Sequence, residues 1–194
     1  LGMDVVVTDH HRPQQRIPQA CAVVDAYQQE DHGPYKDLSG AGVALKLVMA
    51  LEGGDTAGVL EEYADLAALG TVADVVPVLG ENRAIVKAGL RILAQGGRAG
   101  VDALMEESGM GGKAATATSL AFTVIPRINA TGRMGAPERA VRLLTCDSFE
   151  EAAPLSQEIC EDNDRRREVE AQIAQEAVEK IEKDPALLYS RVIV

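Results

Sequence analysis

An Asp-His-His cluster lies near the start of the chain, directly after a short apolar run. The run is Met3–Val7, whose β-branched residues predict a buried strand. The cluster is Asp9, His10 and His11. Ligands of open α/β sheets gather at the carboxyl ends of strands, and an Asp can orient an imidazole through its second nitrogen. The cluster therefore predicts a metal and phosphate site, with a polar surface loop as the alternative for an isolated His-His pair.

A single carboxylate interrupts the apolar stretch Leu69–Pro77. It belongs to Asp74, in the sequence LGTVADVVP. Burying a charged group in apolar surroundings is costly unless something compensates the charge, and a divalent cation would do so. The alternative is a cap on a helix or turn, a common position for Asp.

Two arginines and an asparagine follow an apolar segment in Pro126–Met134, which reads PRINATGRM. The guanidinium fork of Arg127 or Arg133 matches the oxygens of a phosphate, and Asn129 can add a hydrogen bond. Gly132 would let the backbone come close to a ligand. These residues predict phosphate binding, and an ordinary basic loop is the alternative.

The elements that must position these residues alternate between short strands and helices. A second strand is predicted over Ala22–Val24, and an apolar run over Leu120–Ile125 is closed by Pro126. Helices are predicted over Gly40–Leu51, Leu60–Val72, Asn82–Leu93, Val101–Glu107 and Pro137–Leu144. Aromatic residues make up only 3% of the chain, so the core must be aliphatic. We expect an α/β fold with a parallel sheet flanked by helices.

One long amphipathic helix is predicted over Phe149–Lys183. A helix of this length spans on the order of 50 Å and could join two domains or pair with another chain. Residues 147–184 carry 13 acidic and 5 basic side chains of the chain's 30 and 19, so most of the net charge of -11 lies here. The acidity therefore lies away from the Asp-His-His cluster and does not exclude a nucleic-acid partner.

The composition excludes several other classes of protein. No apolar run approaches the roughly 18 residues of a membrane span, and nothing reads as a signal peptide. The cysteines Cys21, Cys146 and Cys160 lie far apart, without metal-ligand spacing. They suit a reducing compartment, so we expect a cytoplasmic protein with no membrane partner.

Taken together, the motifs resemble those of the RecJ family in the DHH phosphoesterase superfamily. The matching stretches are VVVTDHH, LSGAGVALKL, LGTVADVVPVLGENRAIVKAGL and PRINATGRM, with Asn163 and Arg166 placed like the family's Asn-x-x-Arg. Their order and spacing agree along essentially the whole chain. The cluster TDHH alone would indicate only the superfamily, whereas the later pair of motifs is far more specific.

The resemblance implies a metal-dependent exonuclease that degrades single-stranded DNA from the 5′ end in repair and recombination. It implies two Mn²⁺ ions, with Mg²⁺ possible, and His10 and Asp74 as metal ligands. Asp9 and His11 would be catalytic, through support of the cluster and contact with metal or phosphate. Arg127, Asn129 and Arg133 would bind the DNA backbone. Mixed imidazole and carboxylate ligands favour Mn²⁺ over Mg²⁺.

The resemblance also implies that the chain is an internal fragment. The family's first two Asp motifs are expected before Leu1, and a substrate-binding domain is expected after the long helix. We expect a DHH domain over 1–147, an interdomain helix over 148–184 and the start of a truncated domain over 185–194, with a strand at Arg191–Val194. The fragment alone is expected to be inactive, and repair proteins are possible partners.

Two alternatives and the oligomeric state stay open at this point. The first alternative is a DHH oligoribonuclease or cyclic-dinucleotide phosphodiesterase, which shares the same cluster. The second is a non-catalytic scaffold, derived from a DHH domain, that binds DNA or proteins.

Overall fold

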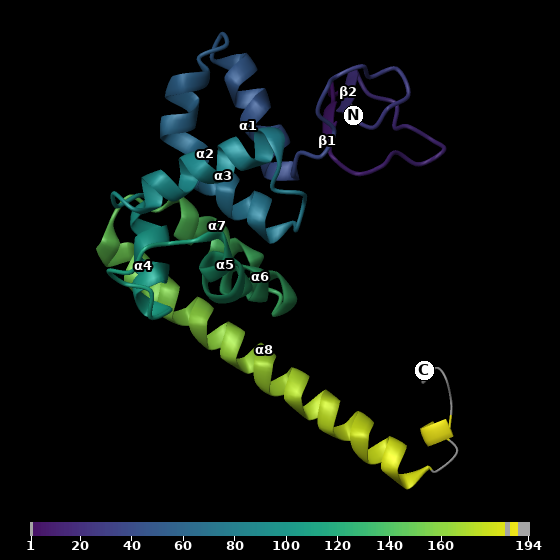
Figure 1. The fold of residues 1–194 in the computed structure, drawn as a ribbon, viewed down its shortest axis with the longest axis vertical. Helices are drawn as coiled ribbons and strands as arrows, with labels where there is room; N and C mark the ends of the chain where they lie inside the picture. Colours follow the sequence, from purple (N-terminus) through teal and green to yellow (C-terminus); the bar gives the residue numbers. More distant parts are fainter. Residues whose placement is uncertain (1, 185–186, 190–194) are drawn as a thin grey trace.

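The chain is mostly helical, with a small parallel sheet at one end and a long helix at the other (Figure 1). A computed structural model describes residues 2–184 and 187–189. The elements are β1 (Val6–Asp9), β2 (Ala22–Asp25), α1 (Gly40–Leu51), α2 (Thr56–Ala73), α3 (Gly80–Leu93), α4 (Ala99–Glu107), α5 (Ala117–Ser119), the π-helical turn η1 (Leu120–Val124), α6 (Ile125–Arg133), α7 (Pro137–Thr145), α8 (Phe149–Lys183) and the 3₁₀ turn η2 (Leu187–Tyr189).

The two strands pair in parallel, as predicted, and Asp9 faces Asp25 at their carboxyl ends. The prediction of a buried strand is wrong for the described residues, because Val6 is 61% and Val24 is 55% exposed. The first strand also lies later in the chain than predicted. Its register with β2 makes Asp9 the last residue of β1, so the Asp-His-His cluster begins inside the sheet.

Helices α1, α2 and α3 form one packed unit. The first two begin at side-chain caps: the Ser39 side chain accepts a hydrogen bond from the backbone N–H of Gly42, and the Asp55 side chain accepts one from that of Gly58. An apolar cluster fills the space between the helices: Leu45, Val59, Ala67 and Ile85. The predicted apolar face of α3 is confirmed, with Ile85, Val86, Gly89 and Leu93 buried and Leu90 partly buried.

The remaining helices pack around the first part of α8. The enclosed residues of this second cluster include Leu104, Leu120, Leu143 and Ile159, each fully buried. The bounds of α8 agree with the prediction, and Ser148 caps its start. Its last buried residue is Asn163, and the remainder of the helix extends away from the body (Figure 1).

The stretch Pro126–Met134 differs from a loop, because nearly all of it is helical. Pro126 was expected to close the preceding apolar run, but it lies in the first turn of α6. A proline is tolerated there, since the N–H that it lacks has no partner within a first turn. The run before it forms α5 and η1, so the chain is helical from Ala117 to Arg133.

Among the described helices, none is long and apolar enough to cross a membrane. The predicted strand at Arg191–Val194, and most of the expected domain start at 185–194, lie outside the described residues.

Candidate functional site

Asp9 organises the cluster at the end of β1. Its Oδ1 accepts hydrogen bonds from the backbone N–H groups of His10 at 2.7 Å and His11 at 3.1 Å. The same oxygen lies 2.8 Å from Nδ1 of the His11 ring. These bonds, above all the one with the His11 ring, lower the pKa of Asp9 to about 2. Asp9 is therefore ionised near neutral pH and fixes the orientation of His11.

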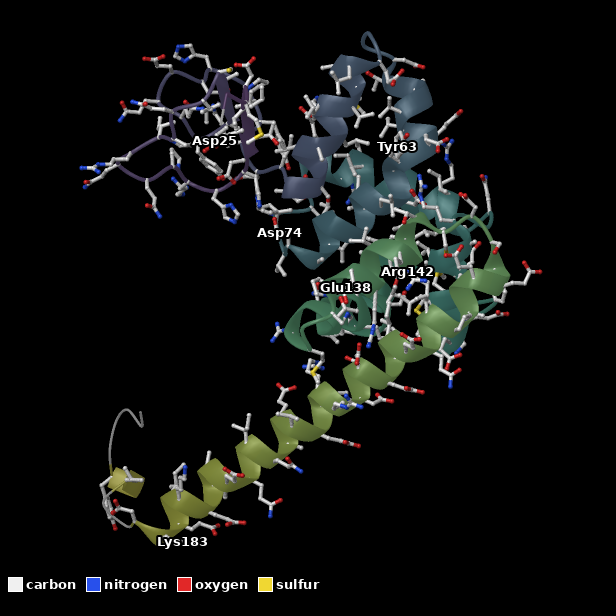
Figure 2. All side chains as sticks on the ribbon, turned by 180° about the vertical axis from the view of Figure 1, so that it is seen from behind. Asp25, Tyr63, Asp74, Glu138, Arg142 and Lys183 are labelled. Atoms are coloured by element: carbon white, nitrogen blue, oxygen red, sulfur yellow. The ribbon has the colours of Figure 1, made fainter. Side chains whose placement is uncertain are left out.

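The ring of His10 turns toward a different part of the chain. Its Nδ1 lies 3.4 Å from Oδ2 of Asp74, and the two side chains are 18% and 38% exposed. On another side the ring lies against the start of α1, where a Cβ on Gly40 would stand 3.3 Å from its Cδ2. Figure 2 shows Asp74 at the edge of the helical body that faces the lobe holding Asp25. Two motifs far apart in the sequence therefore meet here.

Asp74 occupies the C-cap position of α2 and is exposed, so it is not the buried charge that its apolar neighbours suggested. The helix-cap alternative is correct for the backbone, and it also delivers the side chain to His10. The next residue, Val75, has a φ of 59°. This left-handed conformation is unfavourable for a β-branched residue and is common at functional sites.

The donor set fits a divalent cation. Ligand atoms of Asp9, His10 and His11 all lie within 4.8 Å of one another. Two ligands bonded to one ion at roughly 2.1 Å stand about 3.0–3.5 Å apart, which matches the His10–Asp74 separation of 3.4 Å. Imidazole and carboxylate together suit ions such as Mn²⁺. Among the described residues, the side chains of Asp9, His10, His11 and Asp74 meet here.

A hollow of about 380 Å³ opens beside the cluster, at the carboxyl ends of both strands. Asp9 and His11 line it together with Arg12, Arg16 and the buried Asp25. The guanidinium of Arg12 lies 4.8 Å from the centre of the Tyr27 ring, within the range of a cation–π contact. The sequence interpretation missed Asp25 and Arg12. Their signal was available, because Asp25 ends the second strand and Arg12 follows the cluster directly.

The predicted phosphate-binding residues of α6 fall into two groups. Asn129 and Arg133 are exposed and lie one helical turn apart, on the same side of the helix. Asn129 lines a shallow hollow together with Ala73, the residue before Asp74. Arg127 is half-buried, and it donates to the Thr123 carbonyl at 2.5 Å and to Cys160 Sγ at 3.2 Å. Its internal bonds seat α6 on α8, so the structure does not bring it to the exposed side with the other two.

Arg166, on the long helix, lies close to the end of α6. It lines a hollow together with Arg133. Its Nη1 lies 2.8 Å from Glu170 Oε2, and its Nη2 donates to Asn163 Oδ1 at 3.4 Å. The pattern Asn-x-x-Arg is therefore a contact within one helix that holds Arg166 in place beside Arg133.

The chain is similar to a protein family and to several curated proteins. Residues 1–71 match the DHH family, N-terminal domain. The single-stranded-DNA-specific exonuclease RecJ of Bacillus subtilis is 39% identical over 94% of the chain, and that of Thermus thermophilus is 42% identical over 87%. The chain spans only about a quarter of either relative, 23% and 24% of their lengths.

Solved structures agree with this comparison. An exonuclease RecJ bound to manganese matches 93% of the chain with a TM-score of 0.81 and 40% identity, and the chain covers 45% of it. RecJ from Thermus thermophilus in complex with Mn²⁺ matches 90% of the chain with a TM-score of 0.78 and 38% identity. The expected relationship and the predicted fold are thus both confirmed.

Proposed function

From its similarity to the RecJ exonucleases, we propose that the chain belongs with them and provides part of the active site of a metal-dependent single-stranded-DNA exonuclease. The proposed enzyme hydrolyses phosphodiester bonds from the 5′ end. We place it in the cytoplasm, in DNA repair and recombination, where other repair proteins are its partners.

One observation carries the proposal: His10 Nδ1 and Asp74 Oδ2 lie 3.4 Å apart although the two residues are distant in sequence. The contact brings together the end of β1 and the end of α2, which lie in separate motifs. The separation suits two ligands of one cation. The cofactor we propose is Mn²⁺, with Mg²⁺ as a substitute, and two relatives of known structure bind manganese.

Each side chain then has a proposed task. His10 and Asp74 ligate metal, and Asp9 keeps His11 oriented toward metal or substrate phosphate through the bond at 2.8 Å. Asn129 and Arg133 bind backbone phosphates of the DNA, and Arg127 supports them by joining α6 to α8 through its bond to Cys160. A pair of divalent ions, when bound, lowers the pKa of a water molecule and stabilises the charge that develops on the phosphate.

The proposed organisation has one DHH-type domain over residues 1–147 and a connecting helix over 148–184, after which a further domain begins at 185–194. Buried Leu155 and Ile159 support a firm junction between the domain and the helix. Since four donor side chains are too few for two ions, we propose that the 194-residue chain has no appreciable nuclease activity by itself.

A titration of the chain with Mn²⁺, followed by electron paramagnetic resonance, tests the metal centre. His10→Ala and Asp74→Asn should each weaken binding by at least about tenfold, because each removes a direct ligand. His32→Ala is the matched control, since His32 is an exposed histidine outside the cluster. Equal affinities in all four proteins would rule out the proposed site.

Substrate class is tested by fluorescence anisotropy in the presence of Mn²⁺. We expect 5′-phosphorylated single-stranded DNA to bind more tightly than a cyclic dinucleotide, and Arg133→Ala to weaken the binding of DNA. A preference for the dinucleotide would favour the phosphodiesterase alternative. An affinity for DNA that changes neither on removal of Mn²⁺ nor in His10→Ala would favour the non-catalytic scaffold.

A further inference from the structure

A fully buried asparagine lies at the start of α3. Asn82 is 0% exposed, and its Nδ2 donates to the carbonyl of Asp37 at 2.6 Å and to that of Pro77 at 3.0 Å. Both partners are acceptors, so the amide must present its nitrogen to them. Within the described residues, Oδ1 of Asn82 is then buried without a partner. A buried oxygen without a hydrogen-bond partner lowers the stability of the fold. Packing alone therefore does not account for an asparagine at this position.

The first of its two bonds fixes the segment that leads under His10. Asp37 lies two residues before Ser39, the N-cap of α1, and its Oδ1 accepts a hydrogen bond of 2.6 Å from Tyr27 just beyond β2. Gly40, which follows the cap, is the residue that the His10 ring lies against. The Asn82–Asp37 bond therefore helps to fix the position of the start of α1 relative to β1, β2 and His10.

The second bond fixes the loop that carries Asp74. Pro77 lies three residues after Asp74, beyond the left-handed Val75. A loop in such a conformation needs a restraint from outside if the preceding side chain is to keep its position. Asn82 supplies this restraint from α3, and it joins the Asp74 loop to the segment beneath His10.

Tyr35 makes a second, parallel connection between the same two segments. Its hydroxyl donates to the carbonyl of Leu79 at 2.8 Å. Gly80 allows this approach, because a Cβ there would stand 2.7 Å from the Tyr35 ring. The hydroxyl groups of Ser39 and Thr71, both buried, lie 3.0 Å apart and join α1 to α2 next to this point.

We propose that Asn82 is a positioning residue for the metal centre: it holds the His10 segment and the Asp74 loop at the separation that one cation requires. Tyr35 assists it from the surface. The inference rests on the proposed metal centre and extends it, because Asn82 acts through its hydrogen bonds to the backbone carbonyls of Asp37 and Pro77.

The test measures Mn²⁺ affinity by electron paramagnetic resonance and stability by urea unfolding, on the whole 194-residue chain. Asn82→Ala should weaken Mn²⁺ binding by about 10- to 100-fold, the range typical of groups that orient metal ligands. Tyr35→Phe removes one hydroxyl from a partly exposed ring, so it should fold, and it should weaken binding about threefold or more.

Two controls separate position from stability. Tyr63→Phe removes a hydroxyl from another partly exposed ring, one that lies over Arg98. Asp65→Asn weakens the ion pair of 3.2 Å between the buried Asp65 and Arg98. Both should leave the Mn²⁺ affinity of the folded chain unchanged, although Asp65→Asn should lower its stability.

Unchanged affinity in Asn82→Ala and Tyr35→Phe, with strong binding by the parent chain, would overturn the positioning role and leave the metal centre intact. A parent chain that binds no Mn²⁺ would overturn both. An equal loss of affinity in Asp65→Asn would mean that any destabilisation has the same effect, which also contradicts the inference. Should Asn82→Ala fail to fold, Tyr35→Phe decides between loss and no change.

Discussion

The imidazole of His10 has little freedom, because Asp74 stands on one side and the first residue of α1 on another. Gly40→Ala would add a Cβ at 3.3 Å from Cδ2 and 3.4 Å from Nε2 of the ring. Ala is normally the better helix former, by about 0.5–1 kcal/mol. We therefore expect the variant to be as stable as the parent chain or more so, and to bind Mn²⁺ about tenfold more weakly because the ring is displaced.

The measurement is a Mn²⁺ titration paired with urea unfolding. Gly132→Ala is a matched control inside a helix, because its Cβ would meet nothing within 4 Å. It should raise stability and leave the affinity for Mn²⁺ as it was. Full Mn²⁺ affinity in Gly40→Ala would mean that the ring has more room than the structure gives it.

Val75, the residue after Asp74, has an unfavourable backbone conformation whose cost can be measured. Its φ of 59° costs a β-branched residue about 1 kcal/mol or more, and its side chain is 87% exposed, so little burial is lost on replacement. Asn tolerates the left-handed region, and Val75→Asn should raise the free energy of unfolding by about 1 kcal/mol. Val75→Ala keeps the Cβ and should gain less. Urea unfolding of the three proteins measures this, and a less stable Asn variant would contradict the strain.

At the scale of elements, the contact between α2 and α3 depends on one glycine. A Cβ on Gly89 would overlap the carbonyl oxygen of Ala64 and the Cβ of Ala68. Gly89→Ala should therefore lower the free energy of unfolding by about 1–3 kcal/mol, although alanine favours the helix. Gly132→Ala, in open space, should change stability in the opposite direction. Calorimetric melting curves of the two variants make the comparison, and a stable Gly89→Ala would show that the helices can separate without loss.

The sequence predicted those elements whose signals are local. The bounds of α1 and α8 agree with prediction, because Ser39 and Ser148 cap them and apolar residues recur at helical spacing. The position of β1 was wrong by about three residues, since its register depends on β2 and not on its own composition. Pro126 was taken as a stop, because single-residue rules do not show that a π-helical turn precedes it.

The candidate site was predicted in its residues but not in its arrangement. The sequence identified His10 and Asp74 separately, and their contact depends on the path of α1 and α2. Asn82 lies within one of the quoted motifs, but its role depends on a hydrogen bond to the carbonyl of Asp37, which is distant in sequence. A usable signal did exist, because Asn82 falls on the apolar face of α3, at helical spacing from Ile85 and Val86.

At the scale of the whole molecule, the acidic residues and the candidate site lie apart. The site occupies the junction between the strand lobe and the helical body, whereas α8 carries much of the negative charge outward as far as Lys183 (Figure 2). Repulsion of a polyanion by this helix is screened beyond about 8–10 Å at physiological salt. The acidic helix is therefore compatible with a polyanion bound at the Asp-His-His cluster, whereas Arg133 lies beside Arg166 and Glu170 of this helix.

The same helix divides into a part that belongs to the core and a part that does not. Past Asn163, no residue of α8 is buried, and Val169 and Ile173 are 45% and 62% exposed. An exposed helix of this length is only marginally stable in water, and surface ion pairs such as Arg166–Glu170 add at most about 0.5 kcal/mol each.

We therefore predict that truncation after Arg167 changes the free energy of unfolding by less than about 1 kcal/mol, because no buried side chain is removed with 168–184. In the parent chain, amide hydrogen exchange should be slow in the buried first half of α8 and fast over 170–183. Truncation after Leu155 is the opposing control, since it removes the fully buried Ile159 and should unfold the second cluster. Slow exchange over 170–183 would contradict the free state of this segment and indicate that another surface, such as a second copy of the chain, covers it.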